Sequence, residues 1–196
     1  MKLLHLDSSA LGGYSVSRQL TADIVTELKR RAPELDIHYH DLAAQPLPHW
    51  APVADAADPA AVSGNLVMEA FQAADIVVIG APMYNFSIPS QLKAWIDRIV
   101  VAGKTFRYTA NGPEGLATGK KVIIASSRGG AYENTPSAPL DFQENYLRSI
   151  FGFIGVTDVS FIRAEGLSMG DEPKAAAIAS ARGSISRLTT PLAEAA

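Results

Sequence analysis

The sequence predicts an α/β protein: a parallel five-stranded sheet with helices on both faces. Three observations lead to this class. Short apolar runs rich in β-branched residues occur at 76–79 and 122–124, and longer segments carry apolar residues at helical spacing. The two kinds of segment alternate along the chain. Continuous apolar runs of this length are typical of strands buried on both faces, and their alternation with helices implies a parallel sheet.

The first strand is expected at residues 3–6. Leu20, Ile24, Val25 and Leu28 then recur three and four residues apart, which predicts an amphipathic helix. A weaker strand follows at 37–42. The same rhythm predicts the remaining elements: a helix near 63–73, a strand at 76–79, a helix over 92–100, a strand at 122–124, a helix at 145–153, a strand at 159–162 and an Ala-rich helix at 174–188.

Two stretches interrupt this rhythm. Residues 43–63 contain four prolines, so we expect a loop before the second helix. Residues 105–119 contain three glycines and a proline between the third helix and the fourth strand, which indicates an excursion such as a hairpin. No internal repeat or linker is visible, and residues 1–196 are expected to form one domain.

Composition excludes several classes of protein. The 196 residues are 47% hydrophobic and 19% charged, as in an ordinary globular chain. There is no cysteine, which excludes a disulfide scaffold, a Cys-ligated metal site and a thiol nucleophile. A net charge of −3 is unsuited to nucleic-acid binding. The apolar runs are too short for a signal peptide or a membrane span, so a soluble, cytoplasmic protein is expected.

Parallel sheets bind ligands at the carboxyl ends of their strands. The loop after the first strand, residues 8–17, brings serines and two glycines to the start of a helix, where free N–H groups attract anions. Ser9, Ser15 and Ser17 add hydroxyl donors for a phosphate. Serine at this place is also a common helix cap, so both roles are open.

The loops after the third and fourth strands are also distinctive. Tyr84 and Phe86 offer either a flat wall for a planar ring or ordinary core packing. Gly129 and Gly130 either allow close backbone approach to a ligand or form a plain turn, and Arg128 adds a charge. Because all three loops share one edge of the sheet, together they favour a phosphorylated planar cofactor, such as flavin mononucleotide (FMN).

These residues resemble the FMN-dependent NADH azoreductases, also called NADH:quinone reductases, of the flavodoxin-like fold. The resemblance implies a three-layer sandwich with strand order 2-1-3-4-5, and it spans nearly the whole chain. It is carried by Ser9 and by GYSVS at 13–17, PMYNFSI at 82–88, QLK at 91–93, GKTFRYT at 103–109, GPEGL at 112–116, TGKK at 118–121, SRGG at 127–130 and GFIG at 152–155.

The resemblance also implies roles for individual residues, with one FMN in each subunit of a homodimer whose active sites are shared. No metal is implied. The residues expected to bind the phosphate are Ser9, Ser15, Val16 and Ser17. Those expected to contact the ring are Pro82, Met83, Tyr84, Asn85 and Phe86 on one side and Ser127, Arg128, Gly129 and Gly130 on the other. The candidates for the substrate pocket are Tyr108, Tyr132 and Phe153.

The implied activity is two-electron transfer from NADH through N5 of FMN to a quinone, with aromatic azo compounds cleaved to amines over two cycles. No side chain needs to act as a nucleophile. The alternatives are an NAD(P)H-dependent flavin reductase with other acceptors, a flavodoxin-type electron carrier and a nucleotide-binding protein without catalysis. The absence of an Arg/Lys cluster for a 2′-phosphate favours NADH over NADPH.

Five other residues attract attention. His38 and His40 share one face of a strand at a spacing that metal ligands use, but no third ligand is evident nearby, which favours surface histidines. Trp50 is expected in the core or at an interface, and Trp95 in the core. Glu165 is expected at the ligand-binding edge, within reach of a dimer interface.

Overall fold

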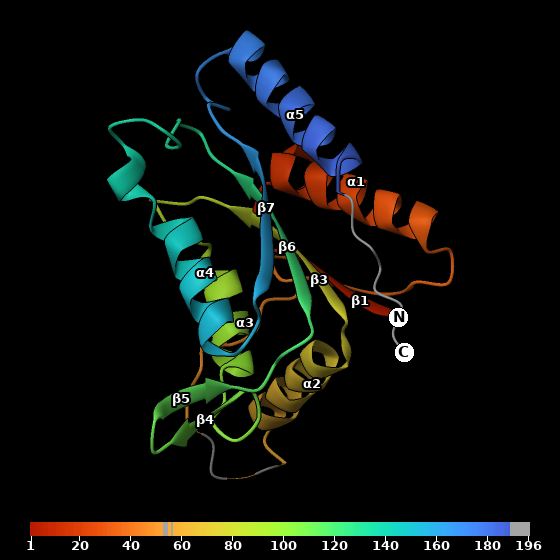
Figure 1. Cartoon of the computed structure of the whole chain (residues 1–196), viewed down its shortest axis with the longest axis vertical. Coiled ribbons are helices and arrows are strands. Elements are labelled where there is room, and N and C mark those ends of the chain that lie inside the picture. The colour runs from red at the N-terminus through yellow and green to blue at the C-terminus, as the bar shows by residue number, and fades with distance from the viewer. Residues whose placement is uncertain (53–54, 56, 189–196) are drawn as a thin grey trace.

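The computed structural model describes residues 1–52, 55 and 57–188 and has a five-stranded parallel sheet at its centre (Figure 1). The order of the strands is β2-β1-β3-β6-β7, with every neighbouring pair parallel. This confirms the predicted order 2-1-3-4-5, because β4 and β5 form a separate sheet. The bounds are β1 (Lys2–Asp7), β2 (Asp36–Asp41), β3 (Ile76–Pro82), β6 (Lys121–Ser127) and β7 (Asp158–Ala164).

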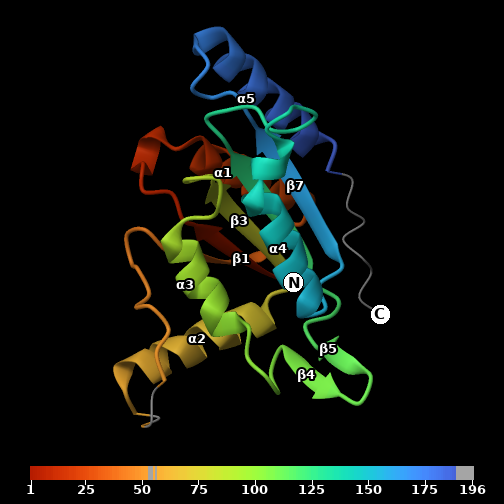
Figure 2. The same cartoon turned by 90° about the vertical axis from the view of Figure 1, so that its left-hand side faces the viewer.

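Helices cover both faces of this sheet. One face carries α1 (Val16–Arg31) and α5 (Asp171–Ser186), and the other carries α2 (Pro59–Ala73), α3 (Ser90–Ile99) and α4 (Phe142–Phe153) (Figures 1 and 2). Short 3-10 turns precede α1 and α4, at Gly12–Tyr14 and Ala138–Leu140. Helix α2 begins earlier than predicted, because Asp58 caps it by accepting a hydrogen bond from the Ala60 N–H at 2.8 Å and Pro59 suits a first helical position.

Two hydrophobic cores lie on opposite faces of the sheet, because successive strand residues point in opposite directions. On β3, Val77 and Ile79 pack with α2, α3 and α4, whereas Ile76 and Val78 pack with α1 and α5. Trp95 on α3 is 1% exposed in the first core, as expected. The central strands therefore read as continuous apolar runs.

The expected hairpin is present as β4 (Phe106–Thr109) and β5 (Gly112–Gly115). It is inserted between α3 and β6, and both views place it beside the C-terminal end of α4 (Figures 1 and 2). The hairpin therefore lies near the amino-terminal ends of the strands, at the opposite end of the sheet from the loops that follow the strands. The expected loop at 43–63 gives way to α2 at Pro59, and its positions 53, 54 and 56 lie outside the described residues.

Within the described ranges, none of the helices combines the length and the apolar character that a bilayer crossing requires. The expectation that residues 1–196 form a single domain stays a prediction, since 189–196 fall outside the described part of the chain.

Candidate cofactor site

The chain adds β2 on one side of β1 and all later strands of the sheet on the other side, so the strand order changes direction between β1 and β3. These strands are neighbours, yet the chain leaves β1 toward α1 on one face and leaves β3 toward α3 on the other. Open parallel sheets bind ligands at such a point, because the two departing loops diverge and leave a crevice between them. All of the predicted cofactor residues lie in the loops at this edge or at the strand and helix ends that flank them.

The loop after β1 presents polar groups around the first turn of α1. The Ser15 hydroxyl caps the helix by accepting from the Arg18 N–H at 3.3 Å and lies 3.0 Å from the Ser17 hydroxyl. Ser9, Ser15, Val16 and Ser17 are all buried. Nevertheless, among the described residues no acceptor contacts the backbone N–H of Val16 or Ser17. Buried donors without a partner at a helix N-terminus suit an anion such as a phosphate.

Tyr84 joins the loops after β1 and β3. Its phenol oxygen lies 3.3 Å from the Ser9 hydroxyl and accepts from the Ala10 N–H at 3.1 Å. A tight turn follows, in which Tyr84 and Ser87 exchange backbone hydrogen bonds of 2.9 and 3.1 Å. Tyr84 therefore connects the loop after β3 to the loop after β1.

The two central residues of that turn have left-handed backbones. Asn85 has φ of 49° and Phe86 has φ of 71°, which matches a two-residue turn of the mirror-image type. Asn tolerates this conformation, but for Phe it costs about 1–3 kcal/mol. Phe86 is 44% exposed and so does not serve as a core residue. In the described part of the chain, neither backbone N–H has an acceptor.

The wall continues onto the loop after β6. The Met83 N–H donates to the Ser127 carbonyl at 2.8 Å, where Pro82 ends β3 beside it. The Phe86 and Tyr132 rings meet edge to face with centroids 6.5 Å apart. Two aromatic side chains thus meet where the loops after β3 and β6 approach each other.

Arg128 carries its charge inside the protein. Its side chain is 1% exposed, so its charge does not lie at the open edge. The guanidinium pairs with Glu144 at 2.5 Å, Glu165 at 2.6 Å and Asp141 at 3.0 Å. Arg163 donates to Glu144 as well. The Arg128 side chain therefore connects its own loop, which follows β6, with the loop after β7 and with the start of α4.

Glu165 holds the adjacent backbone within the same chain. Its carboxylate accepts from the Tyr132 N–H at 3.2 Å and from the Glu133 N–H at 3.1 Å. A Cβ on Gly129 would stand 2.9 Å from the Ser168 hydroxyl, which would have to rotate away. Glu165 thus holds Tyr132, and backbone hydrogen bonds from Ser168 and Gly166 hold Gly129 and Gly130, so the loop after β7 supports this segment.

Sequence reasoning missed a group of charges beneath the loop after β1. Arg18 donates to both carboxylate oxygens of Asp41, each at 2.7 Å, and to the Ser9 carbonyl at 2.8 and 3.2 Å. The Arg18 hydrogen bond holds the pKa of Asp41 at about 2, and the same bond raises the pKa of Arg18. One signal was available: a cation in the first turn opposes the helix dipole and calls for a nearby acceptor.

Asp7 and Tyr39 extend this group. Asp7 is 4% exposed and accepts from the Thr21 hydroxyl at 2.9 Å and the Tyr39 hydroxyl at 3.1 Å. Burial first, and Asp7 second, raise the pKa of the Tyr39 phenol. His38 and His40 stand on the same edge strand, with His38 exposed and the His40 Nε2 3.4 Å from the Gln45 carbonyl.

Tyr108 and Phe153 do not join the other site residues. Phe153 contacts Phe106 with ring centroids 4.7 Å apart, and the ring centroids of Phe106 and Tyr108 lie 5.4 Å apart. Tyr108 lies on the hairpin and is 75% exposed. The opposite end of α4 is at the crevice, where the Phe142 N–H donates to the Phe86 carbonyl. A 12-residue helix spans about 17 Å. Within one chain, these aromatics lie a helix length from the crevice.

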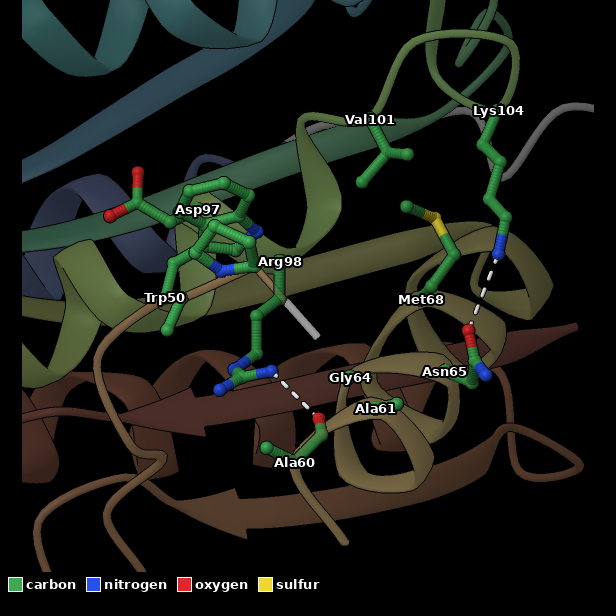
Figure 3. Close-up of a pocket in the computed structure, with 12 residues that line it drawn as sticks. Trp50, Ala60, Ala61, Gly64, Asn65, Met68, Asp97, Arg98, Val101 and Lys104 are labelled. Carbon is green, nitrogen blue, oxygen red and sulfur yellow. Dashed lines mark hydrogen bonds between the residues drawn. The ribbon is translucent and has the colours of Figure 1, made fainter. Parts of the chain in front are cut away.

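A cavity of about 380 Å³ lies elsewhere, between α2, α3 and the loop before α2 (Figure 3). Trp50 lines it and is 60% exposed, so it is not a core residue. Arg98 donates to the Ala60 and Pro48 carbonyls at 3.0 and 2.9 Å. Arg98 thereby fastens the loop to both helices.

The chain is similar to known proteins along nearly its whole length. A family model described as having a flavodoxin-like fold matches residues 1–188. An FMN-dependent NADH:quinone oxidoreductase of Rhizobium meliloti (strain 1021) is 56% identical over 196 residues, covering 94% of this chain and 95% of that protein. FMN-dependent NADH:quinone oxidoreductase 2 of Xanthomonas euvesicatoria pv. vesicatoria (strain 85-10) is 59% identical over 199 residues, covering 94% and 92%. Among solved structures, an azoreductase from Bacillus anthracis str. Sterne is 26% identical, with a TM-score of 0.88 and coverage of 96% and 98%.

Proposed function

The chain belongs to the flavodoxin-like family whose model it matches, and from this premise we propose that it is an FMN-dependent NADH:quinone oxidoreductase that also cleaves aromatic azo compounds. The observation that carries the proposal is the arrangement of the loops that follow β1 and β3. There, the buried N–H groups of Val16 and Ser17 have no acceptor among the described residues, which suits an anion, and Tyr84 links Ser9 and Ala10 to the loop after β3. Phosphate and planar ring are the two halves of FMN.

Each loop has a distinct binding task in this proposal. Ser9, Ser15, Val16 and Ser17 hold the phosphate through hydroxyl and N–H donors. Residues 82–86 contact one side of the ring, and 127–130 approach it from the other, where the role of Arg128 is to fix the backbone. The N–H groups of Asn85 and Phe86, which have no acceptor in the described ranges, donate toward an electron-rich ring edge, which stabilises negative charge without reorganisation.

When bound, FMN supplies the two-electron chemistry, accepting from NADH and passing the electrons to a quinone or azo acceptor. In this proposal, the Phe86 and Tyr132 rings, which meet edge to face, border the slot in which planar molecules stack. Because stacking discriminates weakly between planar molecules, one slot serves the nicotinamide and the acceptor in turn. A cytoplasmic location, where NADH is made and used, belongs to the same proposal.

The proposal includes a homodimer with shared active sites. Tyr108 and Phe153 are aromatic and lie a helix length from the crevice of their own chain. A second copy of the chain can bring the same residues to that crevice. The exposure of Tyr108, 75%, is what a residue that contacts a partner needs before assembly.

Spectroscopy tests the proposed function directly. The purified protein, with FMN added, is expected to show a bound-flavin absorbance band. NADH should bleach the band under nitrogen, and a quinone should restore it. Steady-state rates at several quinone concentrations should give parallel double-reciprocal lines, and NADH should be oxidised faster than NADPH.

Three results would contradict parts of this reading. A protein that does not bind FMN would overturn the function. Bound flavin that NADH and NADPH leave oxidised would favour an electron carrier. Intersecting lines would show that donor and acceptor occupy separate places, which would exclude the shared slot.

A further inference from the structure

We propose that Arg18 and Asp41 form a lock that holds the phosphate loop, residues 8–15, in the shape that accepts the FMN phosphate. Neither residue is among those expected to touch the cofactor. The proposal rests on the proposed function and adds a positioning pair to it.

The geometry of Arg18 supports this role. Its Nε and Nη2 both donate to the Ser9 carbonyl, at 3.2 and 2.8 Å, while Nη1 and Nη2 donate to Asp41, each at 2.7 Å. Ser9 is the residue whose hydroxyl meets Tyr84. The planar fork of an arginine is suited to two such pairs of contacts at once, whereas the ammonium group of a lysine is not.

Asp41 anchors the lock to the sheet. It is the last residue of β2 and pairs in register with Asp7 at the end of β1. It also accepts from the Ala43 and Ala44 N–H groups at 3.0 and 3.1 Å, which fixes the carboxylate. The phosphate loop is thus tied at Ser9 to the neighbouring strand, through a side chain from α1.

The charges indicate positioning and not direct attraction of the phosphate. Arg18 has Asp41 at 2.7 Å and Asp7 at 3.8 Å, so its charge is already opposed by two carboxylates. The side chains of Arg18 and Asp41 are 16% and 22% exposed. If Arg18 attracted phosphate by its charge, removal of the Asp41 charge would strengthen binding. If the pair positions the loop, removal of either member weakens binding.

The test compares FMN with riboflavin, which has the same ring and no phosphate. Fluorescence titration of the apoprotein should show that Arg18→Gln raises the FMN Kd roughly tenfold or more, the scale of one lost charged hydrogen bond. The riboflavin Kd should stay within about twofold, because the ring wall is not altered. Asp41→Asn should change both constants in the same way, and the double variant should be no weaker than the weaker single one.

Arg30→Gln is the matched control. Arg30 lies on the same helix in an exposed pair with Glu27, far from the phosphate loop. This variant should bind both flavins like the parent. Thermal unfolding of the apoproteins should show each variant folded. If Arg18→Gln does not fold, Arg18→Lys keeps the charge and loses the fork, and it should weaken FMN selectively.

The outcomes separate the lock from the proposed function. Tighter FMN binding by Asp41→Asn would overturn positioning in favour of direct attraction. An equal loss of FMN and riboflavin, or no loss of either, would overturn the lock while the function stands. A parent protein that binds neither flavin would overturn the proposed function and the lock with it.

Discussion

At the scale of single residues, Asp41 shows how a partly buried charge couples stability to pH. Its pKa in the folded chain is about 2, below the ordinary value of 3.8. The folded state therefore holds fewer protons than the unfolded state between these values. The stabilisation is complete above about pH 4 and is lost as the pH falls toward 2.

We therefore expect Asp41→Asn to lower the free energy of unfolding by about 2 kcal/mol at pH 7. The difference between parent and variant should shrink below pH 4 and approach zero near pH 2. Urea denaturation from pH 7 down to 2.5 measures it. Asp158→Asn removes an exposed partner of Lys121 and should change stability by less than about 0.5 kcal/mol. A gap between parent and Asp41→Asn that stays constant with pH would contradict the coupling.

At the scale of elements, the hairpin and α4 meet through two glycine backbones. A Cβ on Gly115 would stand 2.1 Å from the Gly155 nitrogen, and Gly155 has φ of +96°. The Ala117 N–H donates to the Ile154 carbonyl at 2.8 Å beside this contact. Neither backbone can move away freely, because Gly115 and Gly155 are both followed by buried residues, Ala117 and Val156.

Gly115→Ala is therefore expected to cost about 3 kcal/mol or more, since it forces the hairpin off the end of α4. Gly152→Ala is the matched control. Gly152 lies inside α4, and a Cβ at this position would have nothing within 4 Å. That variant should be neutral or stabilised by up to about 1 kcal/mol. Calorimetric melting distinguishes the two, and equal melting temperatures would show that the glycine contact is not tight.

At the scale of the whole molecule, the site residues fall into two groups that are separated by the length of α4. If each active site takes its crevice from one chain and its hairpin from another, damaged chains should complement one another. Gly13→Asp places a carboxylate in the phosphate loop, at an exposed position where a Cβ would have nothing within 4 Å. Tyr108→Ala removes the exposed aromatic ring of the hairpin.

Each variant alone should have low quinone reductase activity. After refolding as a mixture, about a quarter of the sites should be intact, because half of random dimers are mixed and each contains one site without a change. Unmixed variants kept at the same concentration are the control. Activity that only averages the two variants would contradict shared sites, and sedimentation at that concentration reports the oligomer.

Local patterns were sufficient for the parallel sheet, whereas its strand order was predicted from the resemblance to a known family. Continuous apolar runs marked the central strands, because both faces of each strand are buried, and helical spacing marked the helices that cover them. The three loops at the carboxyl edge could be located for the same reason, since parallel strands bring their ends together. Glycine and proline spacing was sufficient for the hairpin as well.

Tertiary structure alone decided which polar side chains meet. Arg18 and Asp41 are 23 residues apart, and Arg128 and Glu165 are 37 apart. No local periodicity encodes such pairs, because a charged side chain has several possible partners until the fold brings one within hydrogen-bond distance. The inward turn of Arg128 and the left-handed backbone at Phe86 have the same origin. The chain's own pattern specifies which loops gather at the carboxyl ends of the strands, whereas packing between distant segments determines how firmly each loop is held there.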